Sequence, residues 1–151
     1  LFSSLAFVRL RFGAPRALPI RRGRSHHPAH TTHVGHFGSG IGLVGRISGV
    51  GERSSRVLLL TDVASRVPVT IQPSGQSGLI IGDNTLAPPV DFVENRDLIR
   101  PGDRVISSGD GDVFPDGVLI GNVAVDPGGR MRVRLAADYE RLEFLRVLRN
   151  Y

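Results

Sequence analysis

The sequence predicts an all-β fold for most of the chain. From residue 42 onward, short apolar runs alternate with turn residues at intervals of roughly ten, a spacing typical of β-barrels and sandwiches. The 151 residues include 19 Gly and 10 Pro, too many for a helical bundle. Nine strands are expected, at Leu43–Val50, Arg56–Thr61, Val67–Ile71, Ser77–Ile81, Val90–Val93, Arg104–Ser107, Val118–Val125, Met131–Ala137 and Glu143–Arg149.

Two of these runs indicate how their strands are covered. Val57 to Leu60 is apolar at four consecutive positions, which predicts a central strand covered on both faces. In the run from 130 to 135, apolar and Arg residues alternate, so a strand would carry them on opposite faces. The apolar face consists of Met131, Val133 and Leu135, and the basic face of Arg130, Arg132 and Arg134.

The first 38 residues differ from the rest. They show neither the helical nor the strand period, and residues 1–51 contain seven Arg but no Asp or Glu. We therefore divide the chain into an irregular Arg- and His-rich segment, 1–38, and a β domain, 39–151. The working hypothesis is that residues 1–38 are disordered or not native to this fold.

Composition excludes several kinds of chemistry. The absence of Cys excludes disulfides, thiolate metal sites and cysteine catalysis. The five His, four of them repeating every third residue up to His36, lie where Pro28 and Gly35 prevent a helix from aligning them. A disordered tract is favoured over a metal site, and no cofactor or metal is predicted. Aromatic residues make up only 6% of the chain, which disfavours a nucleic-acid-binding barrel, the third functional alternative.

The enzyme alternative is a β-barrel serine hydrolase. The stretch Ser107-Ser108-Gly109-Asp110-Gly111 offers a hydroxyl, and Asp62 or Asp83 could orient a base. Every His, however, lies in the first 36 residues, and the chain has no Lys. We therefore predict no enzymatic activity. The same stretch fits neither a phosphate loop, because Asp110, Asp112 and Asp116 would repel the anion, nor an EF-hand.

Without catalytic residues, the domain is expected to act through its surfaces. Phe114 and Pro115 lie in an otherwise acidic turn, where the ring could anchor a partner or fold inward and plug a barrel end. The arginine face could dock an acidic partner, or be a solvated face neutralised by Asp126, Asp138 and Glu140. The candidate partner-contact residues are Phe114, Pro115, Arg130, Arg132 and Arg134.

An ordered set of motifs from residue 41 to 149 resembles the periplasmic domain of the MreC family of rod shape-determining proteins. The segments that carry the resemblance are Gly42–Gly51, Ser54–Asp62, Ser65–Val69, Pro101–Val105, Ser107–Gly121 and Leu135–Glu143. One residue departs from the pattern: Asp112 stands where the family usually has glycine. Glycine suits a positive φ, and Asp is among the few other residues that tolerate one.

The resemblance implies more than the composition shows. It implies two small packed β-barrels, the first incomplete because the sequence shows no strand before Gly42. It also implies a non-catalytic scaffold of the cell-elongation machinery, on the periplasmic face of the inner membrane and anchored there in the full-length protein. The implied partners are MreD, the MreB system, a class B penicillin-binding protein with RodA, and further copies of the chain.

Overall fold

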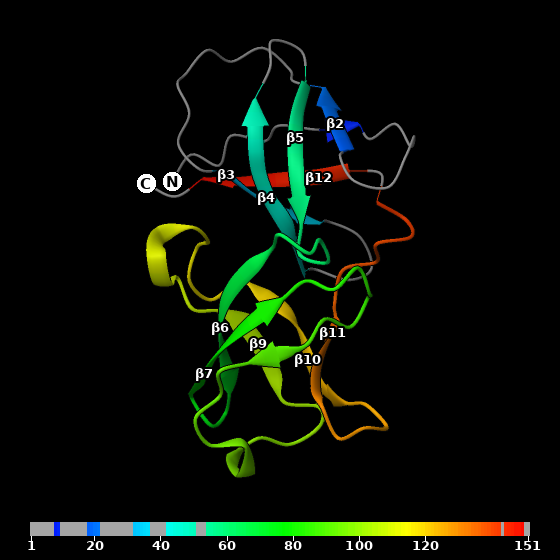
Figure 1. Ribbon diagram of the computed structural model, residues 1–151. Helices are drawn as coiled ribbons and strands as arrows, with labels where there is room; N and C mark the ends of the chain where they lie inside the picture. The colour runs from blue at the N-terminus through cyan, green and yellow to red at the C-terminus, as the bar shows by residue number, and fades with distance from the viewer. Residues whose placement is uncertain are drawn as a thin grey trace.

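The computed structural model describes residues 8–9, 18–21, 32–36, 42–50, 54–142 and 144–149. They form two six-stranded antiparallel sheets, one above the other in Figure 1. The only helical elements in these ranges are two 3-10 turns, η1 (Arg96–Leu98) and η2 (Asp110–Asp112). The strands are β1 (Val8–Arg9), β2 (Leu18–Arg21), β3 (Thr32–His36), β4 (Gly42–Val50), β5 (Ser54–Leu59), β6 (Arg66–Gln72), β7 (Gln76–Ile81), β8 (Val90–Asp91), β9 (Arg104–Ser107), β10 (Leu119–Val125), β11 (Met131–Leu135) and β12 (Phe144–Arg149).

The first sheet has the order β1-β12-β3-β4-β5-β2. The last strand of the chain, β12, returns to this sheet and pairs with both β1 and β3. In Figure 1 it crosses β4 and β5 at a steep angle, as expected for a small, strongly coiled sheet. Val44, Val57, Leu142 and Leu145 are buried in its core.

Three strands of the first sheet lie before Gly42, where the sequence predicted none. The backbone of β2 pairs with β5, and that of β3 pairs with β4 and β12. These strands depend on partners far along the chain, so no local alternation marks them. The boundary at residue 38 stays a prediction, and the described residues before it, 8–9, 18–21 and 32–36, pair into the first sheet.

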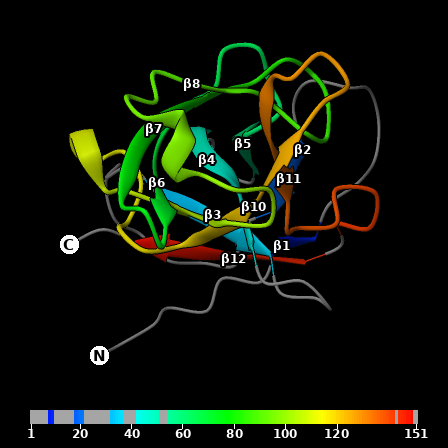
Figure 2. The ribbon, with the colours of Figure 1, turned by 90° about the horizontal axis from the view of Figure 1, so that it is seen from below.

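The second sheet has the order β11-β10-β9-β6-β7-β8. Viewed from below in Figure 2, its strands surround a common centre, and an isolated bridge between Pro89 and Arg132 joins the two ends of the sheet. Thirteen buried hydrophobic residues fill this second barrel, including Val69, Ile71, Val105 and Ile120. All nine predicted strands are present, with ends within a few residues of the expected ones.

The two barrels share residues at their junction. Leu43 of β4 and Leu60, which directly follows β5, are fully buried and belong to the second core, although β4 and β5 are strands of the first sheet. The apolar run from Val57 to Leu60 thus supplies both cores: Val57 packs in the first and Leu60 in the second. The Tyr139 hydroxyl donates to the Val44 carbonyl oxygen at 3.0 Å, and burial raises the pKa of this hydroxyl.

None of the helices in the described ranges is long and apolar enough to cross a membrane. Among the same residues, no three His, Asp or Glu side chains come together as a metal site.

Candidate functional site

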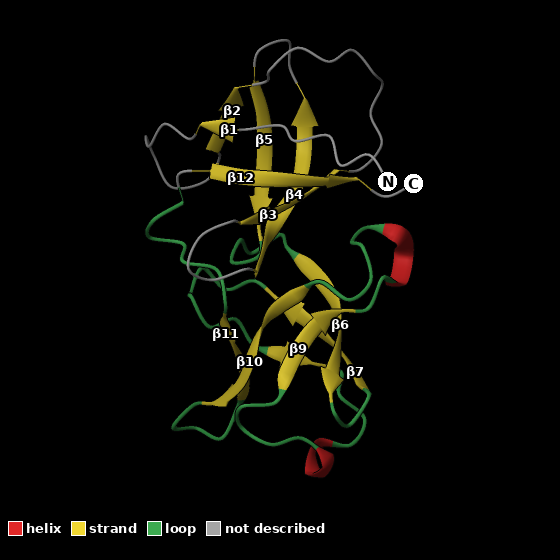
Figure 3. Cartoon of the chain, turned by 180° about the vertical axis from the view of Figure 1, so that it is seen from behind, coloured by secondary structure: helices red, strands yellow, loops and turns green. Residues whose placement is uncertain are grey.

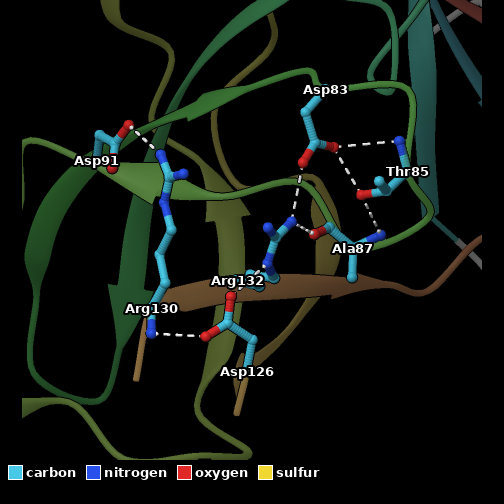
Figure 4. Close-up of polar contacts among 7 residues, drawn as sticks. All are labelled: Asp83, Thr85, Ala87, Asp91, Asp126, Arg130 and Arg132. Atoms are coloured by element: carbon cyan, nitrogen blue, oxygen red, sulfur yellow. Dashed lines mark hydrogen bonds and ion pairs between the residues drawn. The ribbon is translucent and has the colours of Figure 1, made fainter. Parts of the chain in front are cut away.

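The second barrel is closed at a seam between β8 and β11. Among the described residues, the main-chain contact at this seam is the single bridge between Pro89 and Arg132, which includes the hydrogen bond from the Val133 N–H to the Pro88 carbonyl oxygen, 2.9 Å long. The strand β8 is only two residues long. Side chains must therefore contribute much of the closure, and Figure 4 shows that arginine and aspartate residues do so.

Arg132 is the centre of this closure. Its Nη1 lies 2.9 Å from Oδ2 of Asp83 and donates to the Ala87 carbonyl oxygen at 2.9 Å. Its Nε lies 3.0 Å from Oδ2 of Asp126. Arg132 thus joins β11 to the connection between β7 and β8 and to the β10–β11 turn. We call Arg132, Asp83 and Asp126 the latch.

A second arginine extends the closure along the seam. The Arg130 N–H donates to Oδ1 of Asp126 at 2.9 Å, and its guanidinium Nη2 lies 3.3 Å from Oδ2 of Asp91 at the end of β8. The Arg130 side chain is 51% exposed, so solvent screens this pair. The latch side chains are 24–31% exposed, and their ion pairs are correspondingly less screened.

Local turns position the two latch carboxylates independently of Arg132. Oδ1 of Asp83 accepts hydrogen bonds from the Thr85 N–H at 3.1 Å and the Thr85 hydroxyl at 2.6 Å, an Asx-type turn. Asp126 begins the tight turn to β11, which Gly129 completes with a φ of 79°. Both aspartates are thus positioned by the turn chemistry of their own segments.

Hydrogen bonds lower the pKa of both latch carboxylates. Burial raises the pKa of Asp83, but hydrogen bonds from Thr85 and Arg132 outweigh this effect and hold the pKa below its usual value. The pKa of Asp126 is lowered by the hydrogen bond from the Arg130 N–H and then by Arg132. Hydrogen bonds to the two aspartates raise the pKa of the Arg132 guanidinium. Together, these hydrogen bonds favour the charged form of every latch residue.

Arg132→Met should lower the melting temperature by several degrees, because it leaves two carboxylates without their shared partner. Since the folded pKa values lie below that of an unfolded Asp, about 3.9, the stability gained from ionised carboxylates is complete above that pH. It is lost as the pH falls below about 4, so the difference between wild type and variant should shrink there. Thermal unfolding between pH 3 and 7 measures this.

Arg134→Met is the matched control for that experiment. Arg134 is exposed on the same strand and makes no ion pair within the described ranges. Its replacement should leave the melting temperature within a degree or two at every pH. Equal effects of the two substitutions would show that Arg132 does not close the barrel.

The alternation predicted for 130–135 is confirmed by the structure. Met131 and Val133 are buried in the second core, whereas Arg130 and Arg134 are exposed. Asp126 does neutralise Arg132, as expected, but the other carboxylates on this face are Asp83 and Asp91 rather than Asp138 or Glu140. Arg130 and Arg132 thus have partners within the barrel, and a role of the arginine face in partner contact stays a prediction.

Phe114 lies inside the second barrel. Phe114 is only 2% exposed and belongs to the core of the second barrel. This is the position expected if the ring plugs a barrel end. The ring is therefore not available on the surface as an anchor in this structure. Pro115 is half-buried, and its carbonyl oxygen accepts a hydrogen bond from the Ser107 hydroxyl. Contact between Pro115 and a partner stays a prediction.

Ser107, the nucleophile considered for a hydrolase, has a structural role. It is fully buried, and its hydroxyl donates to the Pro115 carbonyl oxygen and accepts from the Val118 N–H at 3.0 Å. These bonds tie both ends of the acidic turn together. The neighbouring Ser108 hydroxyl donates to Oδ2 of Asp110 at 2.8 Å, within the same turn.

Asp112 adopts the backbone conformation expected at the family's glycine position. Its φ is 53°, next to Gly111 at 73°. Asp112→Gly should therefore leave the free energy of unfolding unchanged or raise it by up to about 1 kcal/mol, because glycine carries no Cβ penalty at positive φ. Chemical denaturation measures the change, and a clear loss of stability would show that the Asp112 side chain supports the turn.

Comparisons with known proteins agree with this fold. A family model described as "Rod shape-determining protein MreC, barrel core" matches residues 15–149. The chain is 66% identical over 112 residues to the cell shape-determining protein MreC of Cereibacter sphaeroides, covering 74% of this chain and 37% of that protein. Identity to the MreC of Caulobacter vibrioides is 45% over 107 residues, covering 71% and 31%. The chain thus spans about a third of the length of these relatives.

Solved structures show the same architecture. The major periplasmic domain from the cell shape-determining filament MreC, in a monoclinic crystal form, superposes with a TM-score of 0.77 at 26% identity, covering 96% of this chain and 97% of that one. A chain from a complex between penicillin-binding protein PBP2 and MreC of Helicobacter pylori gives a TM-score of 0.63 at 20% identity, covering 89% and 88%. With nearly the whole chain matched in sequence and fold, this protein belongs to the MreC family.

Proposed function

We propose that the chain is the barrel core of a non-catalytic scaffold that maintains bacterial cell shape by organising peptidoglycan synthases together with MreB and MreD. The observation that carries this proposal is the match of residues 15–149 to the MreC barrel core. The Cereibacter relative, which is described as cell shape-determining, supports it at 66% identity.

The proposed mechanism is binding rather than catalysis. The hydroxyl that could have served a hydrolase, that of Ser107, is buried and bonded within its own turn. The second barrel instead has a filled hydrophobic core, and the latch fastens its seam. A well-packed barrel can hold several partners in a defined arrangement, since preorganised surfaces lose little ordering entropy on binding.

The proposed partners include a class B penicillin-binding protein acting with RodA, besides MreB, MreD and further copies of the chain. The Helicobacter MreC that was solved in a complex with PBP2 supports the first of these. The proposed location is the periplasmic face of the inner membrane, where the full-length protein is anchored. The similar fold described as a major periplasmic domain supports this location.

A domain exchange tests the function. In Cereibacter sphaeroides, the barrel core of the native MreC is replaced by residues 15–149 of this chain, and cell shape is recorded by microscopy. The expected result is normal shape, because the barrel core would present the same surfaces. Rounded cells that contain the chimera at the native level would contradict the proposal.

A further inference from the structure

Phe92 is the most exposed of the large hydrophobic residues in the described part of the chain. It is 77% exposed and follows directly after β8, with a backbone φ of 60°. The other non-glycine residues at positive φ in the described ranges are Asn84 and Asp112, types that tolerate this conformation. A bulky aromatic residue there is an outlier, and such outliers concentrate at functional sites.

The residues on both sides of Phe92 are firmly held. Asp91 pairs with Arg130 across the seam, and its backbone pairs with Leu79 of β7. Val93 packs against the second core, above Gly78, where a Cβ would come within 3.2 Å of a Val93 methyl group. Because Asp91 is held by its strand pairing with β7 and Val93 by the core, the fold itself places the Phe92 ring in solvent.

The segment continues to a second exposed apolar side chain. The Asn95 N–H donates to Oε1 of Gln76 at 3.0 Å, and Oδ1 of Asn95 caps η1 through the Asp97 N–H. Leu98, at the end of η1, is 53% exposed. Figure 3 shows η1 at the end of the second barrel that faces away from the first sheet. We call residues 91–98, which carry Phe92 and Leu98, the distal knob.

The charge of the distal knob limits which kind of molecule could bind it. Its acids Glu94 and Asp97 outnumber its one basic residue, Arg96, and its third acid, Asp91, is paired with Arg130 across the seam. A two-fold contact between copies of this chain would bring two acidic segments together, and an anionic membrane surface would repel them. The charges instead match a different protein, with an apolar pocket for the ring and basic groups around that pocket.

We propose that the distal knob is a docking site, at which Phe92 inserts into an apolar, basic-rimmed pocket of the penicillin-binding protein partner. This proposal rests on the proposed function, which includes that partner. The strand pairing of Asp91 with Leu79 and the core packing of Val93 position the ring, and this preformed placement limits the entropy lost on binding. Aromatic side chains that fill a pocket commonly provide most of the affinity of an interface.

The test is a titration of the chain against the cognate penicillin-binding protein in detergent, followed by calorimetry. Phe92→Gly should weaken binding by about tenfold or more, the size of an interface hot spot. Its melting temperature should equal or exceed that of wild type, because glycine relieves the positive φ. Val63→Ala shortens another exposed apolar side chain, 52% exposed and outside the knob, and should bind within about twofold of wild type.

The possible outcomes separate the two proposals. If wild type binds and Phe92→Gly binds equally well, the docking site is wrong while the proposed function stands. If wild type does not bind, the proposed partner is wrong, and the docking site is overturned with it. A fall in both affinity and melting temperature would assign Phe92 to folding and also overturn the docking site. The docking site would also be overturned if Phe92 were required for self-association, or for binding to anionic phosphatidylglycerol vesicles, and not for binding to the penicillin-binding protein.

Discussion

Phe114→Ala is expected to lower the free energy of unfolding by about 3–5 kcal/mol, the usual cost of removing a buried phenyl ring. Phe114 is one of the largest fully enclosed side chains of the second barrel, and it lies just after η2, where the acidic turn folds over the core. The turn is tied down by Ser107 on both sides, so it cannot easily collapse to fill the cavity. Urea denaturation followed by circular dichroism measures the loss.

Phe92→Ala is the matched control, since it removes the same side chain from a site that is 77% exposed. Its effect on stability should stay within about 0.5 kcal/mol. If Phe114→Ala proved as mild as this control, the ring would not be filling the core. Loss of partner binding by a folded Phe114→Ala protein would then restore the alternative in which the ring contacts a partner.

The strands of the second barrel could be predicted because their signals are local. Alternation in 131–135 and turn clusters such as Pro101-Gly102-Asp103 are properties of neighbouring residues. The strands before Gly42 carry no such signal. β3 becomes a strand by lying between β4 and β12, and β12 begins more than 100 residues later in the sequence. Pairing over that distance cannot be found from periodicity.

At the seam too, contacts between residues far apart in the sequence could not be predicted. The alternation placed Arg132 on the outer face, but its partner Asp83 lies 49 residues away and meets it only because the barrel closes. For Phe92, in contrast, the strand pattern would predict the wrong face. In an extended strand it would share a face with Val90, which is fully buried, yet its positive φ turns the ring into solvent. No sequence pattern indicates a positive φ at phenylalanine.

Gly82→Ala should destabilise the chain by about 3 kcal/mol or more, because the added methyl group has no space. A Cβ at Gly82 would lie 1.8 Å from the Asp62 carbonyl oxygen and 2.9 Å from that of Leu60. Both obstacles are backbone atoms at the junction of the two barrels, and the Gly82 N–H is itself bonded to the Ser65 carbonyl oxygen at 3.2 Å. Relief would require the segment that carries Asp83 to move away from the junction, which would strain the latch.

Gly49→Ala separates this steric effect from the general effect of replacing glycine in a β-protein. Gly49 lies in β4, and a Cβ there would meet only the Cβ of Arg56, at an ordinary 3.7 Å. Alanine also reduces the freedom of the unfolded chain, so this control should be neutral or gain up to about 1 kcal/mol. Thermal and urea unfolding of the two variants measure the contrast. The same entropic gain acts at Gly82. A mild effect there would therefore mean that the backbone at the junction moves easily, and that the two barrels are less firmly joined than the packing of Leu43 and Leu60 in the second core implies.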